Sequence, residues 1–376
     1  MKKTYPRLLL SLVALLVVAS HAHAQGLVDA QRARTALTTF PDSQAVLFLD
    51  VRRTLKEALP LVMPPAELEK NLSQARKVGF DPNSLEYMVV GLRLADTATP
   101  RAIPDIVVLI KGNANFSADA LLTLARLGIS TQGMQTVQET YNTKTLEIVT
   151  LNKPPATGET ATPPKYPVNE VAATALDAST IVVGVPSYVR AVIDAAASGQ
   201  GRLSPALVDL SSRNPTALSS LTVVVPESLP NLLQTMGVPM NGETAKFIGW
   251  VKRLNLSSGM TPLEYNLRAA IQTDSAEHAG ALSGLVRMGL TAAEHAINED
   301  LNKPGPKKSS AQAAANAIKS FTNTTQGDIV LLGTSVPQKL MAELLKQNTQ
   351  HATPSITIKK DVRKRARGGK RPARKG

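Results

Sequence analysis

Apolar runs of strand length alternate along the chain with segments of helical periodicity. The run Ala45–Val51 (AVLFLDV) is apolar and rich in β-forming residues, which predicts a buried strand. Four further strands are predicted in the first half: Leu85–Leu94, Asp105–Ile110, Thr145–Leu151 and Thr180–Val185. Helices are expected around them: Leu27–Leu37, Arg52–Val78, Ser117–Leu127 and Pro186–Ala197.

The second half repeats this order of elements. Its predicted strands are Leu221–Val225, Val251–Ser257, Leu263–Gln272 and Asp328–Gly333. Its predicted helices are a segment that starts at Leu229, a long amphipathic helix Asp274–Asn298 and a closing helix Pro337–Lys346. Proline and glycine content predicts loops at Asn152–Pro167 and Lys303–Ser310.

Three short matches between the halves follow one order along the chain. Phe48 matches Val224 at an offset of 176 residues, and Leu85-Glu86-Tyr87 matches Leu263-Glu264-Tyr265 at an offset of 178. Ile181-Val182-Val183 matches Ile329-Val330-Leu331 at an offset of 148, and the proline-rich loop accounts for part of the difference. This order predicts a tandem duplication, with matched triplets on equivalent strands.

The pattern as a whole predicts an α+β fold: two related units with helices packed on largely antiparallel sheets, and a groove between the units as a place for a ligand. The expected segments are a signal peptide (1–24), a helical segment (25–42), a first unit (43–199), a linker (200–218), a second unit (219–347) and a disordered basic tail (348–376).

The first residues have the pattern of a secretory signal. An apolar stretch, Leu8–Ala19, follows Lys2, Lys3 and Arg7 and precedes Ala22-His23-Ala24. As a helix the stretch would span roughly 18 Å, short of the ~30 Å hydrocarbon core of a bilayer, which favours cleavage after Ala24 over retention as an anchor. We therefore expect an exported protein, periplasmic or extracellular, with no transmembrane span after cleavage.

Composition and charge narrow the picture further. The chain is 43% hydrophobic and has no cysteine, which excludes disulfides, thiol catalysis and Cys-based zinc sites. The formal net charge is +13, of which the signal segment supplies +3 and the last 18 residues supply +9. The remaining body therefore carries a net charge of only +1.

The basic tail is the clearest candidate binding segment. Its charge, glycines and proline predict disorder, and since it has no aromatic residue it cannot stack on bases. We expect it to bind polyanions without reading sequence: lipid headgroups, anionic envelope polymers or nucleic acid. The polyanion-binding residues are Lys359, Lys360, Arg363, Lys364, Arg365, Arg367, Lys370, Arg371, Arg374 and Lys375.

Catalytic motifs are scarce. Nucleophile elbows, phosphate-cradling glycine loops and zinc-binding HExxH are absent from the sequence, and no metal or cofactor is expected. His278 and His295 lie on one face of the predicted long helix, and that face is expected to point toward the core. His295 with Glu299 is at most a two-ligand pair. Asp50, at the end of the first predicted strand, is the best single candidate for a catalytic carboxylate. The simpler interpretation is a strand-end residue that pairs with Arg52 or Arg53.

These observations favour a non-enzymatic exported binding or structural protein whose cationic tail tethers it to an anionic envelope surface or polymer. Two alternatives stay open. One is an envelope hydrolase with its site between the two halves, and the other is a sequence-independent nucleic-acid-binding protein that acts through the tail. Substrate, ligand and oligomeric state do not follow from the sequence.

Overall fold

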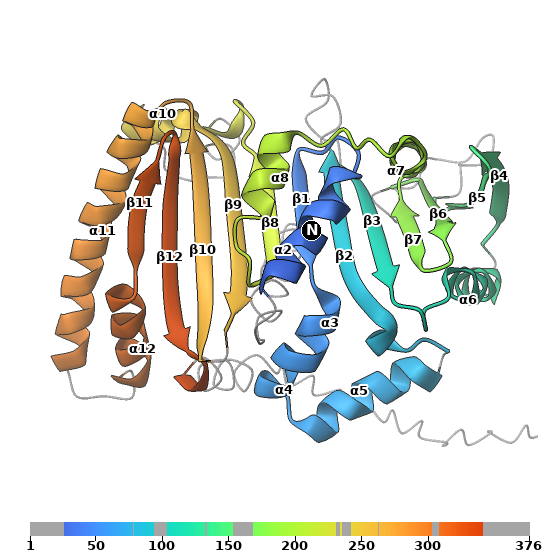
Figure 1. Cartoon of the computed structure of the whole chain (residues 1–376), viewed down its shortest axis with the longest axis horizontal. Helices are drawn as coiled ribbons and strands as arrows, with labels where there is room; N and C mark the ends of the chain where they lie inside the picture. Colours follow the sequence, from blue (N-terminus) through green and yellow to red (C-terminus); the bar gives the residue numbers. More distant parts are fainter. Residues whose placement is uncertain are drawn as a thin grey trace, which may run out of the picture.

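The computed structural model describes residues 26–77, 79–93, 104–131, 134–152, 168–230, 234, 242–261, 263–302 and 308–340 (Figure 1). The expected signal peptide and basic tail lie outside these residues, as does 153–167 of the proline-rich loop.

The described residues form one continuous antiparallel sheet. Strands of the first half are β1 (Ala45–Leu49), β2 (Leu85–Arg93), β3 (Asp105–Gly112), β4 (Thr136–Tyr141), β5 (Lys144–Thr150), β6 (Glu170–Asp177) and β7 (Thr180–Gly184). Strands of the second half are β8 (Ala217–Val224), β9 (Val251–Met260), β10 (Glu264–Thr273), β11 (Thr322–Gln326) and β12 (Ile329–Pro337). The predicted α+β class is confirmed.

Helices pack on the faces and ends of this sheet (Figure 1). In the first half they are α2 (Gly26–Thr38), α3 (Val51–Arg53), α4 (Leu59–Val62), α5 (Pro65–Lys77), α6 (Ala118–Thr131), α7 (Pro186–Ser198) and α8 (Pro205–Ser211). A π-helical turn, η1 (Thr54–Ala58), joins α3 to α4, and a 3₁₀ turn, η2 (Pro82–Ser84), precedes β2. In the second half they are α10 (Gly242–Trp250), α11 (Ala276–Asn302) and α12 (Lys308–Lys319).

The strand order is nearly the same on both sides of the sheet centre. The order is β11-β12-β10-β9-β8-β1-β2-β3-β7-β6-β5-β4, and β1 pairs with β8 at the junction. Outward from that junction, β1-β2-β3-β7-β6 has the counterpart β8-β9-β10-β12-β11. β4 and β5 extend the first side only.

One of the three sequence matches falls on strands that are not counterparts. Leu85-Glu86-Tyr87 opens β2, whereas Glu264 and Tyr265 open β10, the counterpart of β3. The expectation that these triplets are equivalent is therefore wrong. The reason is that an apolar–polar–apolar triplet fits the start of any strand with one buried face. The other two matches lie on the counterpart pairs β1 and β8, and β7 and β12.

The main core lies between one face of the first half and three helices. We call this the front face and define it by Val46, Phe48, Val89, Val107 and Leu109. Figure 1 shows α2 and α8 crossing in front of the central strands, with α7 over β7. Tyr188 of α7 is fully buried against this face, and burial raises its pKa to about 12.

The opposite, rear face is covered mainly at its two wings. In the first half, Phe116, Ala118 and Ile181 form a separate cluster under α6. In the second half, Ser283 of α11 donates to Asn323 of β11, and Ser320 after α12 donates to the Ser335 carbonyl. α11 and α12 therefore cover β11 and β12 from behind.

Several elements with a short or weak periodic pattern were not predicted. Polar β4 and β11, alanine-rich β6 and short α8 have weak patterns, and α8 and the start of β8 lie in the expected linker 200–218. The predicted loop Lys303–Ser310 is wrong at its end, because α12 starts at Lys308. The alanine-rich sequence that follows has high helix propensity, so the helix begins earlier than its proline-rich flank suggests.

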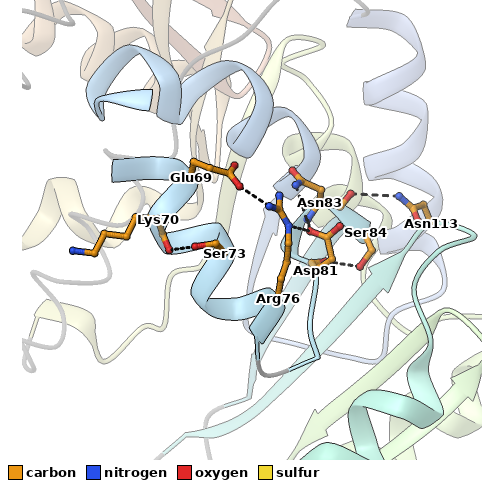
Figure 2. Close-up of polar contacts among 8 residues, drawn as sticks. All are labelled: Glu69, Lys70, Ser73, Arg76, Asp81, Asn83, Ser84 and Asn113. Carbon is orange, nitrogen blue, oxygen red and sulfur yellow. Dashed lines mark hydrogen bonds and ion pairs between the residues drawn. The ribbon is translucent and has the colours of Figure 1, made fainter. Parts of the chain in front are cut away.

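Helix α5 is attached to the body mainly by polar contacts (Figure 2). None of its residues is buried. Arg76 pairs with Glu69 at 2.6 Å and with Asp81 at 3.3 Å. A hydrogen bond from the Asn83 backbone N–H lowers the pKa of the Asp81 carboxyl, with a further contribution from Arg76. The Arg76–Glu69 pair lies within α5, and the Arg76–Asp81 pair links the end of α5 to the N-cap of η2.

Asp50 is a structural residue at the end of β1. It is fully buried, accepts a hydrogen bond from the Arg53 backbone N–H at 2.9 Å, and caps the N-terminus of α3. Its other carboxylate oxygen lies 3.4 Å from Arg32 of α2. Asp50 is thus a strand-end residue, and one of its ion pairs joins it to Arg32 of α2.

Replacing Asp50 by alanine should destabilise the protein by about 2 kcal/mol, because the cap is lost and Arg32 loses a buried partner. Asp50→Asn keeps an acceptor for the cap and should cost less. Urea unfolding measures both. Asp209→Ala, which breaks the exposed Arg34–Asp209 pair, is the control and should stay within about 0.5 kcal/mol of wild type. A D50A variant as stable as that control would contradict the assignment.

Candidate functional site

A polar cavity of about 430 Å³ lies on the second half of the sheet. It crosses β9, β10, β12 and β11, and residues just after α8 form one wall. Its lining is dominated by amide and hydroxyl side chains, including Asn214, Asn255, Ser257, Asn266 and Thr324. A site with converging polar groups in a cavity of this size is typical of small-molecule binding.

The floor of the polar cavity is a hydrogen-bonded network. Asn214 Nδ2 lies 3.2 Å from both Ser257 Oγ and Asn266 Oδ1. Asn255 Nδ2 donates to Ser220 and Thr222, at 2.8 Å each. Asn214, Asn255 and Ser257 are each at most 4% exposed. The floor is thus held in place by its own contacts, which fixes the direction of its polar groups.

Three charged residues line the polar cavity: Arg213, Glu264 and Arg268. Arg213 donates to Gln326 at 3.2 Å, which holds its guanidinium beside β11. Within the described part of the chain, no acidic side chain pairs with Arg268, which is exposed. The lining therefore has an excess of positive charge.

A second cavity, of about 390 Å³, opens on the rear face of the same strands. Its lining is mainly apolar. The large apolar side chains are Leu221, Leu256, Leu267, Phe321 and Leu332, and Tyr265 and Arg268 also line it. Leu256 is 46% exposed and Leu267 is 43% exposed. Both cavities lie within the second half of the sheet and not at the junction between β1 and β8.

The histidines of α11 lie in two different environments. The His278 ring stacks on Trp250, with centroids 4.0 Å apart, and contacts Asp274. The hydrogen bond to His278 lowers the pKa of the Asp274 carboxyl. His295 is 82% exposed and lies 3.5 Å from Glu299, so its expected core-facing position is wrong. Residues 291–296 are all exposed, which shows that this turn of α11 has no packing partner among the described residues.

The ten polyanion-binding residues predicted in the tail, Lys359 to Lys375, lie outside the described residues, and their assignment stays a prediction. The polar cavity was not predicted. Its only signal is the alternation of polar residues at Asn255 and Ser257 on β9 and at Glu264, Asn266 and Arg268 on β10, which resembles an ordinary solvent-facing strand.

The chain resembles known proteins only distantly. No protein-family model matches the chain, and no curated protein matches it. Crystal form III of TP0453 is 8% identical, with a TM-score of 0.38, covering 83% of this chain and 97% of that one. Crystal form I is 9% identical, with a TM-score of 0.37 and 83% and 96% coverage. A TM-score this low does not establish a shared fold.

Among the described residues, no helix has both the length and the apolar character needed to cross a membrane. Also among them, no group of three or more His, Asp or Glu side chains converges in a way that would hold a metal ion.

A chelator should therefore leave the melting temperature of the purified protein unchanged. Thermal unfolding with and without EDTA measures this. A drop of several degrees that zinc reverses would reveal a metal site, and the exposed His295–Glu299 pair would be the first place to look for it.

Proposed function

We propose that this is an exported, non-enzymatic binding protein, and that its cationic tail tethers it to an anionic envelope surface or polymer. The uneven distribution of charge is the observation that carries the proposal. The tail supplies +9, whereas the body between signal and tail carries only +1. Since a net charge near zero attracts a polyanion weakly, adsorption would depend on the tail.

Ion pairs within the body support this division. Arg93 pairs with Asp105, Lys111 with Asp177, Arg126 with Glu147 and Arg190 with Glu139. Each pair holds a basic side chain beside a carboxylate, which reduces its attraction for an external anion. The tail has ten basic residues against a single acidic one, Asp361, so it has no comparable internal neutralisation.

The chemistry of the polar and apolar cavities favours binding over catalysis on the second half of the sheet. A third cavity, on the first half, contains Asp119 and Glu147, and Glu147 is paired with Arg126. Glu264 is the one carboxylate in the polar cavity lining, which contains no histidine. Hydrolysis by paired carboxylates needs a second acid near the first, and a hydroxyl nucleophile needs a base. The apolar cavity lining has no acid or histidine at all.

The proposal includes a tandem duplication of the body. It is supported by the counterpart strand orders β1-β2-β3-β7-β6 and β8-β9-β10-β12-β11. Helix placement agrees, since α6 follows β3 and α11 follows β10. The match runs through strand order and not through the Leu-Glu-Tyr triplets.

Deleting residues 359–376 should nearly abolish adsorption to anionic vesicles, because most of the attractive charge is removed. Each cation near an anionic membrane contributes about 1 kcal/mol. For duplex DNA, contact with about six phosphates would give a log–log salt slope near −5. Scrambling the tail at constant composition should preserve binding, since Coulomb attraction does not depend on residue order. Sedimentation with vesicles and with DNA over a salt series compares the three proteins.

Unchanged affinity after deletion would place the binding surface in the body and contradict the proposal. Loss of affinity on scrambling would indicate a partner that reads the tail sequence. Tight binding to DNA together with negligible binding to anionic vesicles or lipopolysaccharide would favour the nucleic-acid alternative.

A further inference from the structure

The front face of the sheet changes chemistry abruptly at its centre. Strand register places one row of directly opposed residues across it: Val182, Leu109, Val89, Phe48, Ser220, Ser257, Arg268, Gly333 and Thr322. The row is apolar up to Phe48 on β1. From Ser220 on β8 onward it contains only hydroxyl, charged and glycine residues.

Packing among the described residues explains only part of this change: α8 bonds Ser220 through the Ser211 carbonyl and places Leu210 against Ala270 and Ile329. The apolar part of the row lies under α2 and α7, which bury it. Figure 1 shows no helix drawn across the front of β10, β12 and β11. A covering helix would require apolar residues at these positions, as in the first half. The polar part of the face is therefore suited to a polar partner from outside the fold.

The floor of the polar cavity presents hydrogen-bonding groups in fixed directions. Among the described residues, no donor reaches Asn255 Oδ1, although Asn255 is only 2% exposed. Ser257 Oγ accepts from Asn214 and keeps its own proton for another acceptor. An amide acceptor and a hydroxyl donor that line one cavity match the hydroxyl groups of a ligand.

The charges of the lining select among hydroxylated ligands. Arg213 and Arg268 outnumber Glu264, and Arg268 has no acidic partner within the described residues. A guanidinium without a carboxylate at its side is suited to a carboxylate or phosphate, which it binds with two parallel hydrogen bonds. The ligand should therefore combine an anionic group with several hydroxyls.

We infer that the polar cavity of β9, β10, β12 and β11 binds an acidic saccharide, either a uronate or a sugar phosphate. Arg268 binds the anionic group, while Asn255, Ser257 and Thr324 hydrogen-bond the sugar hydroxyls. This inference does not depend on the tail, so the tether proposal can fail while this one holds, and the reverse.

Calorimetric titration of the full mature chain tests it with four probes: glucuronate, glucose 6-phosphate, glucose and inorganic phosphate. Glucuronate, glucose 6-phosphate or both should bind at least tenfold more tightly than glucose and inorganic phosphate. Failure of both acidic sugars to bind at millimolar concentration overturns the inference. Equal binding of glucose overturns the role of Arg268, and equal binding of inorganic phosphate overturns recognition of the hydroxyls.

Two matched pairs of variants locate the site. Arg268→Gln should weaken binding at least tenfold, while Arg287→Gln, on the exposed side of α11, should not change it. Thr324→Val, on the cavity side of β11, should weaken binding about three- to tenfold. Thr325→Val, the next residue on the opposite face of the same strand, should have no effect. Since all four variants carry the same tail, a loss in both members of a pair would place the binding elsewhere and overturn the inference.

Discussion

The pairing of β1 with β8 is the contact on which the rest of the structure depends. Ala45 to Leu49 lie opposite Val223 to Ser219 in an unbroken antiparallel ladder. Without this ladder each half would expose the unpaired backbone of an edge strand, and β1 is apolar on both faces. With it, all twelve strands belong to a single sheet. Helices α2 and α8 pack over the centre of this sheet and are joined to each other by the Arg34–Asp209 ion pair.

The same pairing brings two different faces side by side. Phe48 of β1, which is buried under helices, lies directly opposite Ser220 of β8. Ser220 in turn accepts from Asn255 and donates to the Ser211 carbonyl of α8. The junction thus marks the place where the apolar core of the first half ends and the hydrogen-bonded floor of the second half begins.

Sequence reasoning predicted the elements whose apolar pattern is strong. The run Ala45–Val51 predicted β1, and the periodicity of Asp274–Asn298 predicted α11. It failed for elements without an apolar pattern. β11 has the sequence TNTTQ and is a strand only because its backbone pairs with β12. His295 was placed in the core because helical periodicity gives a face but not the point at which packing stops.

The polar cavity escaped prediction for a related reason. Asn255 and Asn266 look like solvent-facing residues of strands, and only the fold shows that both are at most 8% exposed. Asn266 accepts from Asn214, and Asn255 donates to Ser220 and Thr222. The register of β8, β9 and β10 and the segment after α8 bring these side chains together, and these contacts join residues far apart in the sequence. The charge asymmetry between body and tail, by contrast, is a property of composition and needs no structure.

Engineered cross-linking tests the continuous sheet most directly, and the natural chain has no cysteine to interfere. Leu47 and Leu221 are directly opposed in the β1–β8 ladder, whereas Val223 lies two residues out of register. The double variant Leu47→Cys/Leu221→Cys should form an intramolecular disulfide under mild oxidation, and Leu47→Cys/Val223→Cys should form far less. Mass spectrometry of non-reduced peptides quantifies both. Failure of the opposed pair to cross-link, or equal cross-linking of the two pairs, would contradict the junction between the halves.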